Sequence, residues 1–349
     1  MRCERYLILA MRALLSSVLA LHACLSEARE KSVRIPIDNR SPCKPEMFFG
    51  PGYDLYEGFD MKKWDLDKQT NGWSNPEVDR IYDQVVHNAT RGVAHPMIVE
   101  VGVWKGRSSL MMATSLKTRW YMKQAFDAGA SRQSHGHVWS VDTFAGSMEF
   151  WKLQGKSGRG HKWEPGKKTD RDLRLLHGKP TIYYQFVANI IRDDLKEYVV
   201  PMPIDGGTAA VWFEQNCPYI DVVHLDAAHE YENVLADIRK YWKLLRPGGI
   251  LLGDDYSRNW PGVVRAANEF AASTGLTLHH SNPAARRAAE ARTLAQGTYK
   301  WWVRKPKPDE INRTLATGAV HGANISVSAQ RRASVTKAIS GLLGRYGFG

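Results

Sequence analysis

Two residues that often do chemistry stand at the end of an apolar run near the middle of the sequence. The run, residues 221–225 (DVVHL), is followed by Asp226 and, three residues later, by His229. Its length and apolar character are typical of a parallel strand that is buried on both faces. A carboxylate and an imidazole at the end of such a strand are therefore candidate functional residues.

A second candidate site is a glycine-containing turn. Glu100, Gly102 and Gly106 form an acidic-x-Gly-x-x-x-Gly pattern directly before an expected helix. The glycines let the backbone approach a ligand closely, and the N-terminus of the helix favours anionic groups. Dinucleotide enzymes instead use Gly-x-Gly-x-x-Gly, which needs a glycine where Val101 or Trp104 stands. The turn therefore indicates ligand binding but argues against NAD.

The elements that would position these residues alternate between strands and helices. Strands are expected at 97–102, 137–142, 199–204, 220–226 and 248–255, and helices at 77–87, 106–117, 182–198, 231–245 and 261–273. The segments LTLHH and YKWWVR would close the sheet as a last pair. This pattern predicts a doubly wound, Rossmann-like α/β fold with a mostly parallel seven-stranded sheet and a final antiparallel strand pair. Ligands of such sheets bind at the carboxyl ends of the strands, where the candidate residues lie.

This folded domain is expected to span residues 76–304. A loop-rich extension, residues 31–75, precedes it, and a basic tail without regular structure, residues 305–349, follows it. A Gly-, Lys- and aromatic-rich insertion at about 145–180 separates the second strand from its helix. A loop of this length beside the ligand-binding edge is typical of a lid, a substrate-binding insertion or a disordered segment.

The first 30 residues indicate a targeting segment, because basic residues precede an apolar stretch that ends in small and polar residues. A signal peptide and entry into the secretory pathway are favoured; an uncleaved membrane anchor and an organelle transit peptide are the alternatives. Four Asn-x-Ser/Thr triplets fit a lumenal glycoprotein, at Asn39, Asn88, Asn312 and Asn324.

Two cysteines lie outside this leader, Cys43 and Cys217. In an oxidising compartment they could pair, while a buried free thiol at Cys217 is an equal alternative. No Cys/His spacing suggests a zinc site.

The net charge of +12 is unevenly distributed. From Arg286 to the C-terminus there are 12 Lys/Arg and 3 Asp/Glu, a surplus of nine positive charges, so the rest of the chain is close to neutral. A nucleic-acid-binding face is therefore not expected. The tail could contact anionic membranes or polyanions, but a solvated end is the simpler expectation. The sequence does not indicate an oligomeric state.

The glycine turn resembles the first motif of class I S-adenosylmethionine-dependent methyltransferases. Asp142, which closes VWSVD, matches the acidic residue that holds the ribose hydroxyls in this superfamily, and a carboxylate can accept from both hydroxyls. The pieces LDAAHEY, LLRPGG, GDDY and YYQFVANII resemble the macrolide-sugar O-methyltransferase-like subfamily, the family-24 type of domain, over roughly residues 72–303. The cofactor-binding residues implied are Glu100, Gly102, Gly106, Asp142 and Asp205. Helix capping for Glu100 and turn formation for Asp142 and Asp205 are the structural alternatives.

The resemblance also implies metal-assisted chemistry. Asp226 ends the fourth strand and Asp254 and Asp255 end the fifth, so their side chains can converge, since neighbouring strands lie about 4.8 Å apart. Three clustered acids need a cation, and oxygen ligands suit Mg²⁺, with Ca²⁺ or Mn²⁺ as alternatives. His229 matches the general base of related sugar methyltransferases. Alternatively, only one of Asp254 and Asp255 binds metal while the other caps a turn, and His229 merely caps or packs.

The expected function is therefore methyl transfer from S-adenosylmethionine to a hydroxyl of a sugar, a glycan or a small molecule. A hydroxylase-like enzyme, with iron held by two histidines and a carboxylate, is one alternative. A binding module that retains the fold without catalysis is the other. Aromatic and basic residues near the strand ends could wall the ligand, and His224 is expected to be a satisfied core histidine; the wall candidates are Trp104, Lys105, Tyr256 and Trp260.

Overall fold

The computed structural model describes residues 43–65, 76–126, 135–147, 151, 173–217, 219–283 and 298–311. The expected leader, most of the insertion and the tail beyond residue 311 lie outside these residues, as do three of the four glycosylation triplets, so those expectations remain predictions. Asn88, the fourth, is exposed near the end of a helix. Within the described ranges, no helix combines the length and apolar character needed to cross a membrane.

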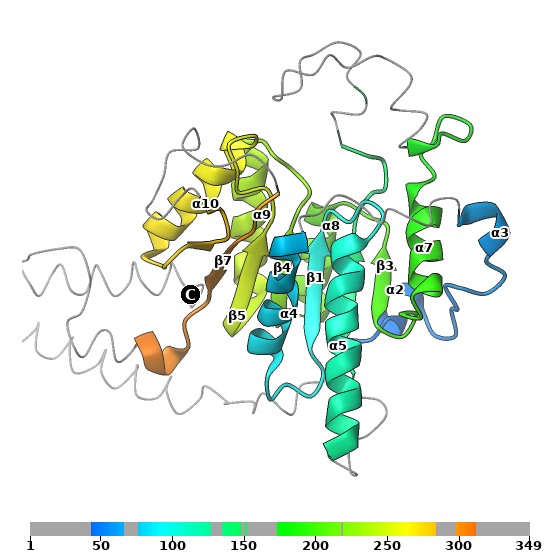
Figure 1. The fold of residues 1–349 in the computed structure, drawn as a ribbon, viewed down its shortest axis with the longest axis horizontal. Helices are drawn as coiled ribbons and strands as arrows, with labels where there is room; N and C mark the ends of the chain where they lie inside the picture. The colour runs from blue at the N-terminus through cyan, green and yellow to red at the C-terminus, as the bar shows by residue number, and fades with distance from the viewer. Residues whose placement is uncertain are drawn as a thin grey trace, which may run out of the picture. The chain divides into compact units, whose positions relative to one another are not determined.

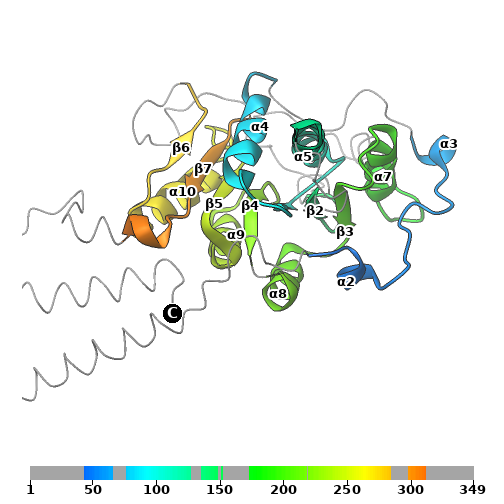
Figure 2. The ribbon, with the colours of Figure 1, turned by 90° about the horizontal axis from the view of Figure 1, so that it is seen from below.

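Seven strands form one sheet in the order β3-β2-β1-β4-β5-β7-β6 (Figures 1 and 2). Their bounds are β1 Met97–Val101, β2 His137–Val141, β3 Val199–Met202, β4 Ile220–Leu225, β5 Leu245–Gly253, β6 His279–His280 and β7 Trp301–Arg304. Strands β1 to β5 pair in parallel, whereas β7 pairs antiparallel with both β5 and β6. The predicted Rossmann-like sheet with its final antiparallel pair is therefore confirmed.

Helices cover both faces of this sheet (Figure 2). The helices on one face are α4 (Pro76–Thr90), α5 (Arg107–Phe126) and α7 (Ile182–Arg192), and those on the other are α8 (Gly206–Asn216), α9 (Tyr231–Leu244) and α10 (Pro261–Thr274). Neighbouring strand residues serve opposite cores: Val222 packs with the first group of helices and Val223 with the second. The central strands β1 and β4 are buried along their whole length, and most of their residues are apolar because both faces of the sheet are covered.

The helix around residue 190 and the following segment differ from the prediction. Helix α7 ends at Arg192, because the chain turns at Asp194, which has a φ of 54°. Helix α8 was not predicted, since Gly206 and Gly207 are weak helix formers. Its start is stabilised by Asp205, whose side chain accepts from the N–H groups of Gly207 and Thr208.

The start of β5 is also different. Arg246 and Pro247, which precede the strand expected at 248–255, lie within β5. The pairing of β5 with β4 shifts register here, between Ile220↔Leu245 and Val222↔Ile250, and the extra residues are accommodated as an irregularity. The expected helix at 106–117 is longer as well, since α5 continues to Phe126.

The N-terminal extension is attached to the outer strand β3 and its neighbours. It contains two short helices, α2 (Glu46–Phe49) and α3 (Met61–Trp64). Cys43 forms a disulfide with Cys217 at the end of α8, so pairing is the alternative that the structure adopts. The Tyr56 hydroxyl donates to the Val199 carbonyl of β3 at 3.2 Å. The extension thereby contacts β3, the strand at this edge of the sheet.

Candidate active site

The glycine turn between β1 and α5 packs directly on the chain that leaves β4. Gly102 has a φ of 90°, and a Cβ atom at this position would overlap the backbone carbonyl of Asp226. Gly106 also has a φ of 90°, and its Cβ would overlap the ring of Phe186. Both positions require glycine, because an L side chain would be strained and would have no room. The predicted cofactor turn and the acidic site after β4 are thus immediate neighbours.

Asp142, at the end of β2, holds this turn in place. Its Oδ2 accepts the N–H groups of Val103 at 2.8 Å and Trp104 at 3.0 Å, and its Oδ1 accepts the N–H of Phe144 at 2.7 Å. Trp104 has a φ of 55°, a conformation that the bond to Asp142 helps to stabilise. A carboxylate has about four acceptor sites, so Asp142 can support the turn and still accept from a ligand hydroxyl. The turn-forming role is observed, and the cofactor role stays a prediction.

Glu100 is fully buried below the turn. It accepts hydrogen bonds from the hydroxyls of Ser108 and Ser109 in the first turn of α5, and its Oε1 lies 2.8 Å from Nδ1 of His224. Glu100 therefore ties α5 to β1 and β4, and any part it plays in cofactor binding is one of positioning the turn. His224, which is also fully buried, is confirmed as a satisfied core histidine.

Asp205 acts as the N-cap of α8. Its Oδ1 accepts the N–H groups of Gly207 and Thr208, both at 2.9 Å, and its Oδ2 accepts the hydroxyl of Thr208 at 2.5 Å. These bonds from Thr208 and Gly207 hold the pKa of Asp205 below its ordinary value. Asp205 thus caps a helix instead of forming the expected turn, and its predicted approach to the cofactor stays a prediction.

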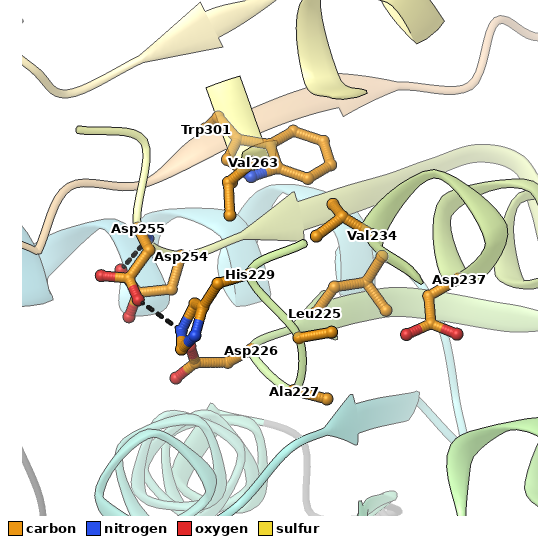
Figure 3. A pocket seen from close by; sticks show the side chains of 11 residues that line it. Leu225, Asp226, Ala227, His229, Val234, Asp237, Asp254, Asp255, Val263 and Trp301 are labelled. Carbon is orange, nitrogen blue, oxygen red and sulfur yellow. Dashed lines mark hydrogen bonds and ion pairs between the residues drawn. The ribbon is translucent and has the colours of Figure 1, made fainter. Parts of the chain in front are cut away.

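Three carboxylates and a histidine converge in a pocket at the carboxyl ends of β4 and β5 (Figure 3). One ligand atom each of Asp226, His229 and Asp255 lie within 4.8 Å of one another, and the same holds for His224, Asp226 and Asp254. The two strand ends are tied together, because the N–H of Asp254 donates to the Leu225 carbonyl at 3.1 Å. The structure therefore brings together the acidic residues that the sequence placed at the ends of the two strands.

His229 is held on several sides. Its Nε2 lies 2.9 Å from Oδ2 of Asp255, and its ring stacks on Trp260 with ring centroids 3.8 Å apart. Gly262 packs closely on the backbone carbonyl of His229, because a Cβ atom at position 262 would overlap this carbonyl. The side chain stays 19% exposed and so remains reachable from the pocket. Trp260 thus supports the candidate base, whereas Tyr256 is buried and packs against His280.

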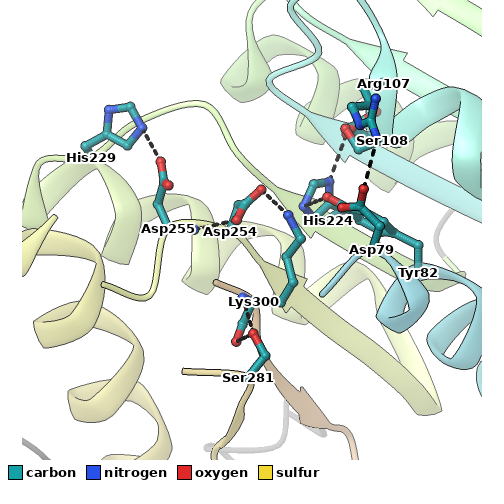
Figure 4. A network of polar contacts seen from close by, with 11 residues as sticks. Asp79, Tyr82, Arg107, Ser108, His224, His229, Asp254, Asp255, Ser281 and Lys300 are labelled. Atoms are coloured by element: carbon teal, nitrogen blue, oxygen red, sulfur yellow. Dashed lines mark hydrogen bonds and ion pairs between the residues drawn. The ribbon is translucent and has the colours of Figure 1, made fainter. Parts of the chain in front are cut away.

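Lys300, which the sequence reading did not single out, also reaches the cluster (Figure 4). It precedes β7, is 1% exposed, and its Nζ forms an ion pair with Oδ2 of Asp254. The ammonium also lies 4.8 Å from the centroid of the Tyr82 ring, over its face. A signal was present in YKWWVR, because a lysine directly before an apolar strand is often buried and then requires a partner such as a carboxylate.

Burial and mutual repulsion shift the pKa values of the cluster. Burial, followed by the charges of Asp254 and Asp255, raises the pKa of Asp226 well above its ordinary value. Burial also raises the pKa of Asp255, and the hydrogen bond with His229 offsets part of this effect. Burial alone would lower the pKa of Lys300, but Asp254 and Asp226 outweigh it and raise this pKa. The cluster therefore has a strong tendency to take up protons or a cation.

The donors fit a hard divalent cation. Carboxylate oxygens are the ligands that Mg²⁺ and Ca²⁺ prefer. Oδ1 of Asp255 is buried and has no hydrogen-bond partner among the described residues, and a cation would satisfy such an oxygen. In Asp254, by contrast, Oδ1 accepts the N–H of Asp255 at 2.7 Å and Oδ2 is paired with Lys300. This arrangement favours the alternative in which Asp255 is a metal ligand and Asp254 forms the turn.

An iron site with two histidines and a carboxylate is not assembled in the described part of the chain. Each of the two candidate ligand groups there holds a single histidine, His224 in one and His229 in the other. His224 is moreover engaged with Glu100. The hydroxylase-like alternative therefore gains no support from the arrangement of these side chains.

The fold and the site define a Rossmann-like protein whose ligand chemistry lies at the carboxyl ends of its central strands. Residues 99–256 match the family model described as a methyltransferase domain. This segment contains the glycine turn and all three aspartates of the cluster. This match agrees with the resemblance to a methyltransferase domain that the sequence motifs predict for the same segment.

Several solved structures that resemble the chain are O-methyltransferases. The O-methyltransferase NovP is 17% identical, with 66% of this chain and 79% of NovP covered and a TM-score of 0.39. An O-methyltransferase from Bacillus cereus, in complex with SAH, is 16% identical, with coverages of 70% and 87% and a TM-score of 0.40. CalS11, a TDP-rhamnose 3′-O-methyltransferase, is 15% identical, with coverages of 65% and 78% and a TM-score of 0.38. No curated protein matches the sequence.

Proposed function

We propose that the protein is a divalent-metal-assisted O-methyltransferase that transfers a methyl group from S-adenosylmethionine to a hydroxyl of a sugar, a glycan or a small molecule. One observation carries this proposal: the glycine turn and the acidic cluster share one edge of the sheet, with Gly102 packed on the backbone of Asp226. A cofactor at the turn and a hydroxyl at the cluster would be neighbours, as direct methyl transfer requires.

The chain offers distinct groups to the cofactor, which when bound supplies an electrophilic methyl group. The backbone at Gly102 and Gly106 provides the close approach, and Asp142 provides acceptors for the ribose hydroxyls. Glu100 and Asp205 support this part of the site by fixing the starts of α5 and α8.

A divalent cation, Mg²⁺ or alternatively Ca²⁺ or Mn²⁺, would be held by Asp226 and Asp255, with Asp254 beside them. Such an ion, when bound, polarises an acceptor hydroxyl and lowers its pKa. His229 serves as the base that receives the hydroxyl proton. Its Nε2 lies 2.9 Å from Oδ2 of Asp255, whose carboxylate would stabilise the imidazolium, and the stacked ring of Trp260 fixes the orientation of the imidazole.

The sequence resemblance to macrolide-sugar O-methyltransferases favours a sugar hydroxyl as the methyl acceptor. The near-neutral charge of the chain before Arg286 suits an uncharged or weakly charged acceptor better than a nucleic acid. Contact of the tail with anionic surfaces remains a separate prediction.

We also infer that the protein enters the secretory pathway. The apolar leader and the disulfide between Cys43 and Cys217 support this inference, because disulfides persist in oxidising compartments. The mature protein should begin after the leader, near Ala23 or Ala28, in N-terminal sequencing. A mature protein that retains the whole leader would contradict a cleaved signal peptide.

The methyltransferase proposal is tested by titration calorimetry of S-adenosylmethionine into the full chain, with Mg²⁺ and with a chelator. We expect micromolar binding that Asp142→Asn weakens at least tenfold, because the amide cannot accept from two hydroxyls through both terminal atoms. Asp193→Asn, an exposed acid at the end of α7, is the matched control and should bind like the wild type. Absence of binding to the wild type under both conditions would contradict the proposal.

A further inference from the structure

A buried lysine stands inside the acidic cluster, and its position is fixed by the fold. The N–H of Lys300 donates to Oγ of Ser281 at 2.9 Å, and its carbonyl accepts the N–H of Ser281, also at 2.9 Å. The side chain runs from this backbone to Oδ2 of Asp254, and its ammonium lies over the face of Tyr82 (Figure 4). Because Lys300 is 1% exposed, its charge has no access to water and depends on these partners.

Asp254 transmits the effect of Lys300 to the rest of the cluster. Its Oδ2 holds the ammonium of Lys300, and its Oδ1 accepts the N–H of Asp255. Asp255 has a φ of 60°, which is unfavourable for any residue other than glycine unless local bonds support it. In this conformation Oδ2 of Asp255 pairs with His229, and Oδ1 is left without a hydrogen-bond partner among the described residues.

The charges of the cluster suit one divalent cation. Three carboxylates, those of Asp226, Asp254 and Asp255, face one permanent positive charge, that of Lys300. When His229 is neutral, the cluster therefore has a net charge of two negative units. Because Lys300 pairs with Asp254, Asp226 and Asp255 are the two carboxylates that have no ion pair with the lysine. We propose that Lys300 is the resident counter-cation of the cluster: it neutralises Asp254, positions the Asp254–Asp255 turn and leaves Asp226 and Asp255 to bind one divalent cation in competition with the lysine charge.

This inference rests on the metal site of the proposed function, and it makes a claim that methyl transfer alone does not. Removing the ammonium frees Asp254 as a third ligand and removes a repulsive charge next to the metal. Lys300→Met should therefore bind a divalent cation more tightly than the wild type, although the metal-free protein should be less stable. Lys300 is a positioning residue in this account, because it acts through Asp254.

The test compares Mn²⁺ binding by calorimetry and thermal unfolding in chelator for the full-length wild type, Lys300→Met and Lys305→Met. Lys305 is the matched control. It is buried at the other end of β7, but its ammonium donates to the backbone carbonyls of Trp242 and Leu245 and not to a carboxylate of the cluster. We expect Lys300→Met to bind Mn²⁺ roughly tenfold or more tightly and to gain more in Tm from Mn²⁺ than the wild type. Lys305→Met should have a lower Tm, with Mn²⁺ affinity unchanged.

Equal Mn²⁺ affinity in the wild type and Lys300→Met overturns the proposal, and so does an absence of Mn²⁺ binding in both. If Lys300→Met does not fold, the double variant Lys300→Met/Asp254→Asn is measured instead. Folding of the double variant supports the pairing of the two charges, whereas a double variant that also fails to fold overturns it. S-adenosylmethionine binding is measured on the same wild-type sample. Loss of cofactor binding would contradict the methyltransferase function, whereas intact cofactor binding with unchanged metal affinity would contradict the role of Lys300 alone.

Discussion

Strands β4 and β5 carry buried charges at both ends, and the two ends differ in how those charges are balanced. At the amino ends, Asp221 of β4 pairs with Arg246 of β5. Oδ2 of Asp221 also accepts the N–H of Met97 at 2.8 Å, and Arg246 donates to the carbonyls of Ala89 and Pro247. One negative charge therefore meets one positive charge, and the remaining polar atoms of the pair bind backbone groups.

At the carboxyl ends of the same strands the balance is different. Three carboxylates share one lysine and one histidine, the pKa values of Asp226 and Asp255 are raised by burial, and one oxygen of Asp255 has no partner among the described residues. A protein pays for such an arrangement in stability, so surplus buried charge indicates a functional site, whereas a balanced pair supports the fold.

The largest effect is expected for Asp226→Asn. Methyl transfer to an acceptor found by screening sugar hydroxyls should fall by about 10³-fold or more, because the substitution removes a metal ligand worth several kcal/mol in the transition state. The free energy of unfolding in chelator should stay the same or rise at neutral pH, since a buried carboxylate with a raised pKa opposes folding when it is ionised. A strongly destabilised variant would show that Asp226 supports the fold instead.

His229→Gln should lower the rate of methyl transfer by about 10²- to 10⁴-fold, the usual contribution of a general base. S-adenosylmethionine affinity should be retained, because the glycine turn is unchanged. His279→Gln is the matched control, since His279 is exposed and stacks on Trp302 away from the cluster. Wild-type turnover by His229→Gln would assign His229 a packing role.

Arg246→Met should lower the free energy of unfolding by about 3–5 kcal/mol in urea titrations, because Asp221 would remain buried without its partner. Arg304→Met, which removes the exposed pair with Glu310, should cost less than about 1 kcal/mol. The activity of the folded fraction of Arg246→Met should match the wild type. A specific loss of catalysis would contradict the division between a structural and a functional end.

A pH-dependent effect is expected for His137, at the amino end of β2. Burial, with His135 and His95 nearby, lowers the pKa of His137 to about 3, whereas the unfolded chain has an ordinary value near 6.5. Between these values the unfolded state binds a proton that the folded state excludes. Stability should therefore fall as the pH falls from 6.5 toward 3, by up to about 1.4 kcal/mol per pH unit.

His137→Gln should flatten this part of the stability profile, measured by urea unfolding at a series of pH values. The control is His279→Gln, which should keep the wild-type slope. An unchanged slope in His137→Gln would mean that groups other than this histidine cause the loss of stability at low pH.

Much of the fold and part of the site follow from local sequence patterns. The strands around Val99 and Val223 are readable from the sequence because a strand buried on both faces is mostly apolar. The convergence of Asp226 with Asp254 and Asp255 was also predictable, since parallel neighbours bring their carboxyl ends to the same edge. Helix α8 was not predicted because it begins with two glycines, which are weak helix formers. Capping by Asp205 and packing of its buried residues stabilise the helix nevertheless.

The sequence by itself therefore determined the class of fold, the glycine turn and the acids of the site, all of which depend on residue types at short spacing. Only the tertiary structure decided which charges meet. Lys300 and Asp254 are 46 residues apart and come together because β7 returns antiparallel beside β5. The partner of a buried charge depends on which strand lies across from it and on which backbone groups are already paired, and no local pattern encodes these long-range contacts.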